Sequence, residues 1–401
     1  MHKNNIFNAF VQALIRQFCF YMNLNLKYFL SFFSSLTLWV VASASFAQNR
    51  EDITWHNLFP LDNGVIQGQV RVANEPIGFS RLPASLKPQI RDAVWGLGSN
   101  MAGTYIEFTS NAQSLVFKYT VTGFLNMPHM PSTGVSGLDL YVFEKEKSWT
   151  WIPGRYNFKD TVSYQYEKLG GDSGKIYRLY LPLYNGIKNM QIGLPLGSSL
   201  NFIKGNSATL KSLNPIVVYG TSIAQGGCAS RPGLAWPSIL GRMVNKEVIN
   251  LGFSGNGRLE APIIELMIAQ KPSVYILDCL PNMGSEKLFS DTSLVSTIKK
   301  AVYQIRKKDI QTPIVLSQHS GGRTLNLLQV DRNLEFNRTS DLLIVAFDQL
   351  KREGVKEIHL MTTKAIGLDL ESTVDGSHPN DIGMMKHAQA YRKLLKKIRQ
   401  D

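Results

Sequence analysis

A serine, a histidine and an aspartate in the C-terminal half of this chain are the residue types that acyl transfer requires. Ser222 follows a Gly-Thr pair, and Asp375 precedes His378 by three residues. A serine hydroxyl is a weak nucleophile, and an imidazole can take its proton near neutral pH and return it to the leaving group. A carboxylate nearby can orient the ring and stabilise the imidazolium. We therefore expect Ser222, His378 and Asp375 to form a catalytic triad.

Three hydrogen-bond donors are candidates for an oxyanion hole, because the attacked carbonyl develops a negative charge that preorganised donors must meet. They are the backbone N–H groups of Ser222 and Gly255 and the side-chain amide of Asn282. A glycine at position 255 lets the backbone approach the substrate closely. Taken singly, each of these motifs is as typical of a turn or a helix cap as of a catalytic site. Their combination indicates catalysis.

The elements that must position these residues form an alternating pattern. Continuous apolar stretches separated by amphipathic ones predict a parallel sheet with helices on both faces. Strands are expected at 215–219, 248–251, 274–280, 314–317 and 358–361, and helices near 235–244, 261–270, 294–307, 341–353 and 381–399. Ligands of such a sheet bind beyond the carboxyl ends of its strands. Each candidate group follows a strand or precedes the last helix, so we expect all of them on one rim.

The preceding part of the chain has a different pattern of apolar and polar residues. Between about 53 and 202, short stretches alternate apolar and polar residues, as in 114–121, and glycine and proline separate them. This pattern predicts a β-sandwich or jelly roll, with a helical turn within 85–95. The change in rhythm places the boundary near Ser212, which gives a β-sandwich domain over 48–212 and an α/β domain over 213–401.

The segments around Ser222, Gly255, Asn282 and the Asp375–His378 pair resemble, in the same order, the sequence blocks of the SGNH (GDSL-like) hydrolase superfamily. The resemblance implies a flavodoxin-like three-layer α/β/α sandwich. It also implies the same triad and the same oxyanion hole. The stretches 79–83, 94–109 and 127–136 further resemble the β-rich N-terminal domain of some secreted bacterial members.

Three positions depart from the family pattern. Thr221 replaces the usual aspartate beside the nucleophile, and Pro281 and Met283 flank Asn282 where the family often has glycine and aspartate. Neither change removes a catalytic group. Because of these departures, the hydrogen bonds around the nucleophile cannot be carried over from the family pattern.

Three further residues are candidates for substrate binding. His319 follows the fourth expected strand, where a pocket role and a structural loop role are equally supported. Arg258 follows the glycine-rich turn, and here the start of a helix is favoured over a substrate contact. His129 lies in the loop 127–131, which we expect to reach from a docked N-terminal domain toward the site. His378, His319 and Asp375 match no compact zinc signature, so we expect no metal and no cofactor.

The first 47 residues have the features of an export signal. Lys27 precedes an apolar run over 28–41, and small residues lead to Ala47, where we expect cleavage. Met22 is an alternative start. An uncleaved membrane anchor is the alternative reading, because the run approaches the ~20 residues of a membrane span. Cleavage predicts a secreted or periplasmic bacterial protein without stable membrane insertion.

Two cysteines remain after removal of this signal. Cys228 follows the first catalytic strand and Cys279 ends the third, and these strand ends should be neighbours. An exported protein meets oxidising surroundings, which favours a disulfide between them. Two separate buried thiols are the equally supported alternative.

The charge and the candidate site together narrow the range of possible functions. The net charge is +13, but the basic residues are scattered or lie along one terminal helix, so nucleic-acid binding is not expected. The leading hypothesis is a secreted serine esterase that removes small acyl groups, with acetyl favoured, from carbohydrate. The expectation that the substrate is a carbohydrate rests on the resemblance, on export and on the accessory β-domain. The alternatives are a lipid or thioester acyl-hydrolase and a non-catalytic carbohydrate-binding protein, although the latter predicts loss of a triad member.

Overall fold

The computed structural model describes residues 11–17, 20–22, 52–59, 64–143, 148–171, 174–205, 214–321 and 330–398. Residues 54–401 form one compact unit, which contains every element discussed below except the first residue of β1. The export signal expected over 1–47 lies largely outside the described residues, and so does the boundary expected at 212. Among the described residues, no helix has the length and the apolar character needed to cross a membrane.

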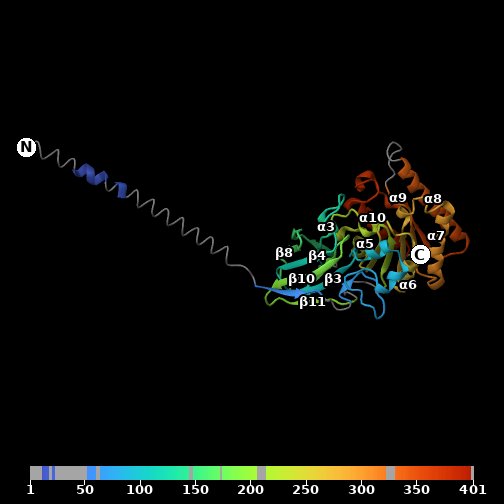
Figure 1. The fold of residues 1–401 in the computed structure, drawn as a ribbon, viewed down its shortest axis with the longest axis horizontal. Helices are drawn as coiled ribbons and strands as arrows, with labels where there is room; N and C mark the ends of the chain where they lie inside the picture. The colour runs from blue at the N-terminus through green and yellow to red at the C-terminus, as the bar shows by residue number, and fades with distance from the viewer. Residues whose placement is uncertain are drawn as a thin grey trace, which may run out of the picture. The chain divides into compact units, whose positions relative to one another are not determined.

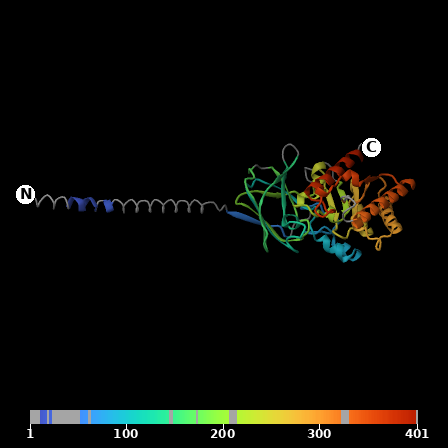
Figure 2. The same ribbon diagram turned by 90° about the horizontal axis from the view of Figure 1, so that it is seen from above.

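Two sheets form the β-rich part of this unit (Figure 2). One has the order β1(Ile53–Asn57)-β10(Ile187–Pro195)-β4(Leu115–Val121)-β8(Val162–Tyr166)-β7(Arg155–Asn157). The other has the order β11(Leu200–Phe202)-β3(Tyr105–Ser110)-β9(Ile176–Tyr180)-β5(Asp139–Phe143)-β6(Trp149–Ile152), with β2(Ile66–Gln67) also on β3. Neighbouring strands run antiparallel from β10 to β7 in the first sheet and from β11 to β6 in the second.

The alternation of the sequence explains how these sheets pack. In β4, Leu115, Phe117 and Tyr119 are buried, and Lys118 between them is exposed. The inward side chains of β4 share one core with those of the other sheet, among them Phe108 of β3. The two sheets therefore form a sandwich, as the alternating pattern predicts.

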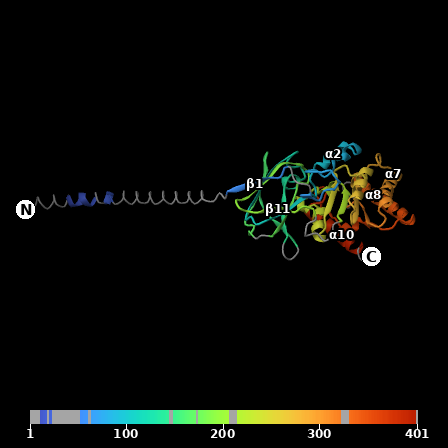
Figure 3. The same ribbon diagram turned by 90° about the horizontal axis from the view of Figure 1, so that it is seen from below.

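The second sheet system is parallel and has the order β13(Val248–Gly252)-β12(Ile216–Gly220)-β14(Val274–Asp278)-β15(Ile314–Ser317)-β16(Ile358–Met361). This is the flavodoxin-like order 2-1-3-4-5. One face packs against α4(Ser222–Gln225), α5(Trp236–Val244), α9(Thr363–Ile366) and α10(Asp381–Ile398). The other packs against α6(Ala261–Ala269), α7(Asp291–Lys308) and α8(Val330–Arg352), of which α7 and α8 lie side by side (Figures 1 and 3). The predicted three-layer α/β/α fold is confirmed.

The N-terminal segment contributes to the core of the α/β part. Val70, Leu82, Leu86 and Val94 are buried in the cluster that also contains the side chains of α6 and α7. They come from the segment that includes the 3-10 helix η1(Ala84–Gln89) and α2(Asp92–Gly98). One face of the parallel sheet is therefore completed by residues that precede the sandwich strands β3 to β11.

Both remaining cysteines are buried free thiols, so the disulfide considered from the sequence is not formed. Their positions give the reason: Cys279 belongs to the core cluster on one face of the parallel sheet and Cys228 to the cluster on the other. Cys279 Sγ instead contacts the carbonyl oxygen of Tyr219 at 3.6 Å. Burial raises the pKa of the Cys228 thiol to about 12, which suits an unreactive apolar side chain.

Candidate active site

Ser222 lies at the turn between β12 and α4, where the parallel strand ends at the sheet rim. It is the first residue of α4, and Thr221 is the N-cap, whose hydroxyl accepts a hydrogen bond from the N–H of Ile223 at 3.4 Å. Thr221 therefore takes a helix-capping role where the family usually has aspartate. Gly220 permits the sharp turn, because a Cβ there would lie 2.6 Å from that of Ala224.

The three expected triad residues come together in the structure. Ser222 Oγ lies 2.8 Å from Nε2 of His378, and Nδ1 of the same ring lies 2.8 Å from Oδ2 of Asp375. A carboxylate only accepts, so Nδ1 carries the hydrogen and Nε2 is left to accept from the serine hydroxyl. This arrangement can take the hydroxyl proton and hold the resulting imidazolium beside a negative charge.

Asp375 is held as a carboxylate by its own loop. Its partial burial acts to raise the pKa, but donors oppose this: Oδ1 accepts from the backbone N–H of His378 at 2.8 Å and of Ser377 at 3.0 Å. These bonds, with the bond from the His378 ring, lower the pKa of Asp375 to about 2. The carboxylate is thus ionised throughout the pH range in which an imidazole titrates.

Residues 226–235, which link α4 to α5 and are called the Ser222 loop below, are fastened to the segment that carries His378. The N–H of Cys228 donates to the carbonyl of Pro379 at 3.2 Å. Ser230 bonds the carboxylate of Asp381 twice, through its N–H at 2.9 Å and its hydroxyl at 2.6 Å. Nucleophile and base are therefore placed by two loops that are bonded to each other.

Residues 253–257, called the glycine turn below, follow β13 on the same rim. Gly255 has φ +68°, and a Cβ added there would meet no atom within 4 Å, so the space beside its Cα is open. Gly257 has the opposite constraint, because a Cβ there would lie 2.0 Å from the carbonyl oxygen of Gly220. The turn is thus packed against the nucleophile strand at Gly257 and open at Gly255, as an oxyanion donor requires.

Asn282 ends the 3-10 helix η3(Leu280–Asn282), which follows β14. The hydrogen-bonding pattern assigns its side-chain oxygen to the backbone N–H groups of Asn256 and Gly257, at 2.9 and 3.2 Å. The amide NH₂ then points away from these two donors. The glycine turn therefore orients the amide of Asn282 as well as presenting the N–H of Gly255.

The loop 127–131 reaches the site, as expected. Met127 and Met130 exchange backbone hydrogen bonds of 3.2 and 3.1 Å, which makes a tight turn with His129 at its tip. His129 is exposed, and its ring centroid lies 6.1 Å from that of His378. His129 is therefore in position to contact a bound substrate.

The other two substrate-binding candidates have structural contacts. His319 is buried, stacks on Phe336 with 3.5 Å between ring centroids, and accepts from the N–H of Gly321 at 2.7 Å. Arg258 donates through its N–H to Glu260 at 2.8 Å, at the start of α6, and through its guanidinium to Gly255 O at 3.3 Å. These contacts favour a loop role for His319 and a supporting role in the glycine turn for Arg258.

Several contacts from the sandwich to the site were missed from the sequence. The hydroxyl of Tyr184 donates to the carbonyl of Ser222 at 3.3 Å, and Leu183 O accepts from the side chain of Gln225 at 3.1 Å. Asp139 of β5 is buried and accepts from Arg231 of the Ser222 loop. Only Asp139 carries a signal in the sequence, since it is a charged residue inside an apolar strand pattern.

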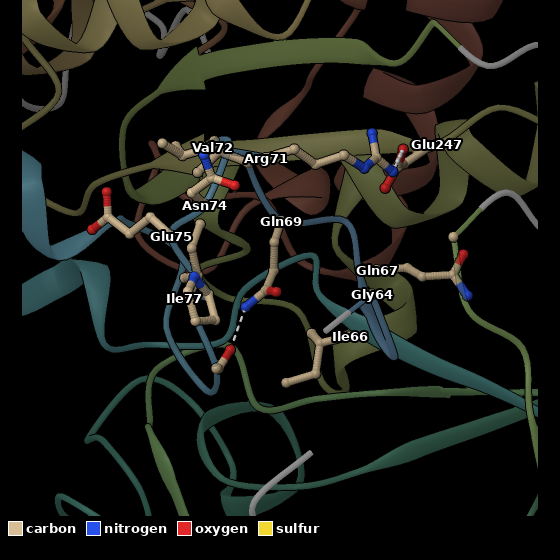
Figure 4. A pocket seen from close by; sticks show the side chains of 14 residues that line it. Gly64, Ile66, Gln67, Gln69, Arg71, Val72, Asn74, Glu75, Ile77 and Glu247 are labelled. Carbon is tan, nitrogen blue, oxygen red and sulfur yellow. Dashed lines mark hydrogen bonds and ion pairs between the residues drawn. The ribbon is translucent and has the colours of Figure 1, made fainter. Parts of the chain in front are cut away.

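A pocket of about 480 Å³ lies elsewhere in the structure (Figure 4). Its lining includes Gln69, Arg71 and Glu247, and the last two form an ion pair of 2.5 Å. Glu247 directly precedes β13, so this pocket adjoins the amino-terminal end of the strand, and none of the candidate catalytic residues lines it.

Two family models match the chain. Residues 213–396 match the GDSL-like lipase/acylhydrolase family, and residues 53–200 match the N-terminus of SGNH-hydrolase-type esterases. The Gly-x-Asp-Leu-Tyr motif after which the second model is named is present here at 137–141 and contains Asp139. No curated protein matches the chain.

Solved structures agree with this assignment. A Bacteroides ovatus protein described as a GDSL-like lipase is 29% identical, with a TM-score of 0.76, over 87% of this chain and 98% of its own. A salicylyl-acyltransferase from a tetracycline biosynthetic pathway shares the fold at 17% identity and TM-score 0.66, over 88% and 99%. So does a family two carbohydrate esterase from Clostridium thermocellum, solved with cellohexaose, at 13% identity and TM-score 0.51, over 74% and 93%.

The chain therefore belongs to the SGNH (GDSL-like) hydrolases. More particularly, it is a carboxylic ester hydrolase of the type that carries a β-rich N-terminal domain before the α/β domain.

Proposed function

We propose that this enzyme removes small acyl groups, acetyl above all, from carbohydrate, with Ser222 as nucleophile, His378 as base and Asp375 as the residue that orients the base. The observation that carries the proposal is the unbroken chain of 2.8 Å contacts from Ser222 Oγ through the His378 ring to Asp375. The open space beside the Cα of Gly255 on the same rim supports an oxyanion hole there.

In the proposed mechanism, His378 Nε2 takes the proton of Ser222 as Oγ attacks the ester carbonyl. The oxyanion is stabilised by the N–H groups of Ser222 and Gly255 and by the amide of Asn282. His378 then protonates the departing sugar hydroxyl, which leaves an acyl-serine. A water molecule, deprotonated by the same nitrogen, releases the carboxylic acid.

The carbohydrate part of the proposal is supported by the carbohydrate esterase that shares the fold and was solved with cellohexaose. The exposed tip of the loop 127–131 supports it too, because a substrate with a large alcohol part would extend past His129. Export through the N-terminal segment, which the sequence favours, would bring the enzyme to polysaccharide. N-terminal sequencing of the mature protein tests cleavage after Ala47.

The decisive experiment compares acetate release from acetylated oligosaccharides with p-nitrophenol release from acetyl and octanoyl esters. Ser222→Ala should lose nearly all turnover, and Ser296→Ala, an exposed serine on α7, should lose none. Wild-type turnover in Ser222→Ala would end the proposal. A preference for octanoyl over acetyl esters identifies a lipid acyl-hydrolase instead. Glycan binding without hydrolysis of any ester identifies a non-catalytic binding protein.

A further inference from the structure

The outer edge of the parallel sheet is covered by one buried arginine. β13 is the edge strand, and the N–H of Phe253 donates inward to Gly220 of β12. Because strand residues alternate in direction, the carbonyls of Asn250 and Gly252 point the other way, to the edge. Arg81 NH1 donates to both, at 3.0 and 2.8 Å. Arg81 thus satisfies the last two edge carbonyls before the glycine turn.

The remaining contacts of Arg81 explain why the residue is an arginine. Its Nε donates to Asn100 O and its NH2 to Leu97 O, both at 2.7 Å, and its guanidinium lies 5.0 Å from the ring of Phe253. Its described hydrogen bonds therefore all go to neutral backbone carbonyls. Burial lowers the pKa of Arg81 to about 9, so the side chain stays charged at neutral pH. Only a guanidinium has enough donors, in a rigid fork, for four converging carbonyls.

A second arginine holds the other end of the glycine turn. Arg91, the N-cap residue of α2, donates to Asn256 Oδ1 at 2.8 Å and to Asn256 O at 2.6 Å, and pairs with the carboxylate of Glu260. Gly255 lies between these two anchored ends and has no neighbour within 4 Å of where a Cβ would lie. The guanidinium of Arg258 donates to the carbonyl oxygen of Gly255 at 3.3 Å, and the N–H of Gly255 is then placed by the two anchored ends of the turn.

We propose that Arg81 and Arg91 are positioning residues, which hold the glycine turn so that the N–H of Gly255 and the amide of Asn282 are preorganised for the oxyanion. The inference rests on the proposed function, because it assigns those two groups to the oxyanion hole. The turn orients Asn282 through the N–H groups of Asn256 and Gly257, so one displacement of the turn moves both donors. A displacement of about 1 Å can cost on the order of 100-fold in rate.

The test uses Arg81→Lys, Arg81→Met and Arg91→Ala, with Arg306→Met as the matched control. Arg306 also donates to backbone carbonyls, those of Lys356, Asp309 and Glu357, but these precede β15 and β16 at the other end of the sheet. Active serines are counted by the burst of p-nitrophenol from diethyl p-nitrophenyl phosphate. Turnover of p-nitrophenyl acetate is then expressed per active serine. A small alkyl trifluoromethyl ketone, whose hemiketal oxygen takes the oxyanion position, is used as inhibitor.

We expect Arg91→Ala to lower kcat per active serine about 10-fold and the Arg81 variants about 10- to 100-fold, with KM within about twofold. The inhibition constant of the ketone should rise in parallel with the loss of kcat. Arg306→Met should change neither quantity per active serine. A purely structural role would reduce the number of active serines and leave both quantities unchanged.

The inference is overturned if Arg91→Ala retains both wild-type kcat per active serine and wild-type ketone affinity, or if KM alone rises. Should the Arg81 variants fail to fold, Arg91→Ala decides, because its side chain is 41% exposed. Failure of the proposed function has a different signature: the wild-type enzyme would then give a burst that Ser222→Ala does not abolish, or no burst at all.

Discussion

Asp139 of the β-sandwich and Arg231 of the Ser222 loop form an ion pair in which Arg231 NH1 lies 2.7 Å from Asp139 Oδ2. Asp139 also accepts from Trp151 Nε1 at 2.6 Å and from the N–H of Gly233 at 2.9 Å. Arg231 is further stacked over Trp151, at 4.2 Å from the ring centroid. The Ser222 loop is therefore held by the sandwich on one side and by the His378 segment on the other.

Asp139→Ala should reduce the free energy of unfolding by about 3 kcal/mol, because it leaves a largely buried guanidinium without its counter-ion. Urea unfolding measures this change, and Asp160→Ala, which removes an exposed aspartate, is the control. An unchanged unfolding midpoint in Asp139→Ala would show that the ion pair does not secure the interface.

Asp278→Asn should stabilise the protein at alkaline pH and have little effect at acidic pH. Asp278 is 1% exposed, and neither carboxylate oxygen has a hydrogen-bond partner among the described residues. Burial raises its pKa from 3.8 to about 7. Below pH 3.8 the carboxyl is protonated in both states. As the pH rises toward 7, Asp278 ionises only in the unfolded state. The free energy of unfolding therefore falls, by about 4 kcal/mol in total.

Urea unfolding of the wild type and of Asp278→Asn at pH 4 and pH 8 checks this sign. The variant should gain stability mainly at pH 8, because an amide is uncharged at every pH. Asp160→Asn should gain nothing at either pH. A variant less stable than the wild type at pH 8 would contradict the prediction and indicate that the carboxylate itself is needed in the fold.

Asn282→Ala should lower kcat about 100-fold with little change in KM, because an oxyanion donor acts on the transition state more than on the bound ester. Steady-state kinetics with p-nitrophenyl acetate measure both constants. Asn245→Ala, at the C-cap of α5, is a control of the same chemical change outside the site. If only KM rose, Asn282 would be a substrate contact and the oxyanion hole would lack its side-chain donor.

Most of the α/β part could be predicted from the sequence, because its strands are predominantly apolar runs bounded by turn residues. The strands expected at 314–317 and 358–361 have those limits in the structure, and the final helix differs by one residue. The helix expected at 341–353 begins earlier in the structure, at Val330. Its first turns were not predicted because they contain too many polar residues to form an apolar stripe. The rim position of the catalytic candidates follows from the same pattern.

The contacts that connect the two parts of the chain could not be predicted in this way. Arg81 bonds only backbone carbonyls in its described contacts, and no side-chain pattern marks a carbonyl as a partner. The sequence left a disulfide and two separate thiols equally supported for a related reason: strand order brings two strand ends together but does not say on which face each thiol lies. The structure has two free thiols, one on each face.

His129→Ala should raise KM for acetylated oligosaccharides several-fold and leave ethyl acetate hydrolysis within about twofold. His129 is exposed at the tip of its turn, with its ring 6.1 Å from that of His378, and under the proposed function a substrate with a large alcohol part would extend past it. Acetate release from both esters gives the comparison, and His56→Ala in β1 is the control. Equal effects on the two esters would indicate that His129 acts on His378 instead of on the substrate.

The α/β segment 213–401 expressed alone should not fold to an active enzyme. It would lack Val70, Leu82, Leu86 and Val94, which complete the core on the α6 and α7 face of the parallel sheet. Each such side chain contributes about 1.5–3 kcal/mol when buried, and the total stability of a domain is only about 5–15 kcal/mol. It would also lack Arg81, which satisfies the edge of β13.

Circular dichroism on heating and p-nitrophenyl acetate turnover test this expectation, with the segment 52–401 as the control. The control keeps the compact unit and should melt cooperatively with full activity. The segment 213–401 should show no cooperative transition and no turnover, because a sheet face without its covering side chains exposes apolar surface and favours aggregation. Full activity of that segment on both p-nitrophenyl acetate and acetylated oligosaccharide would mean that the N-terminal residues are dispensable for fold and catalysis alike.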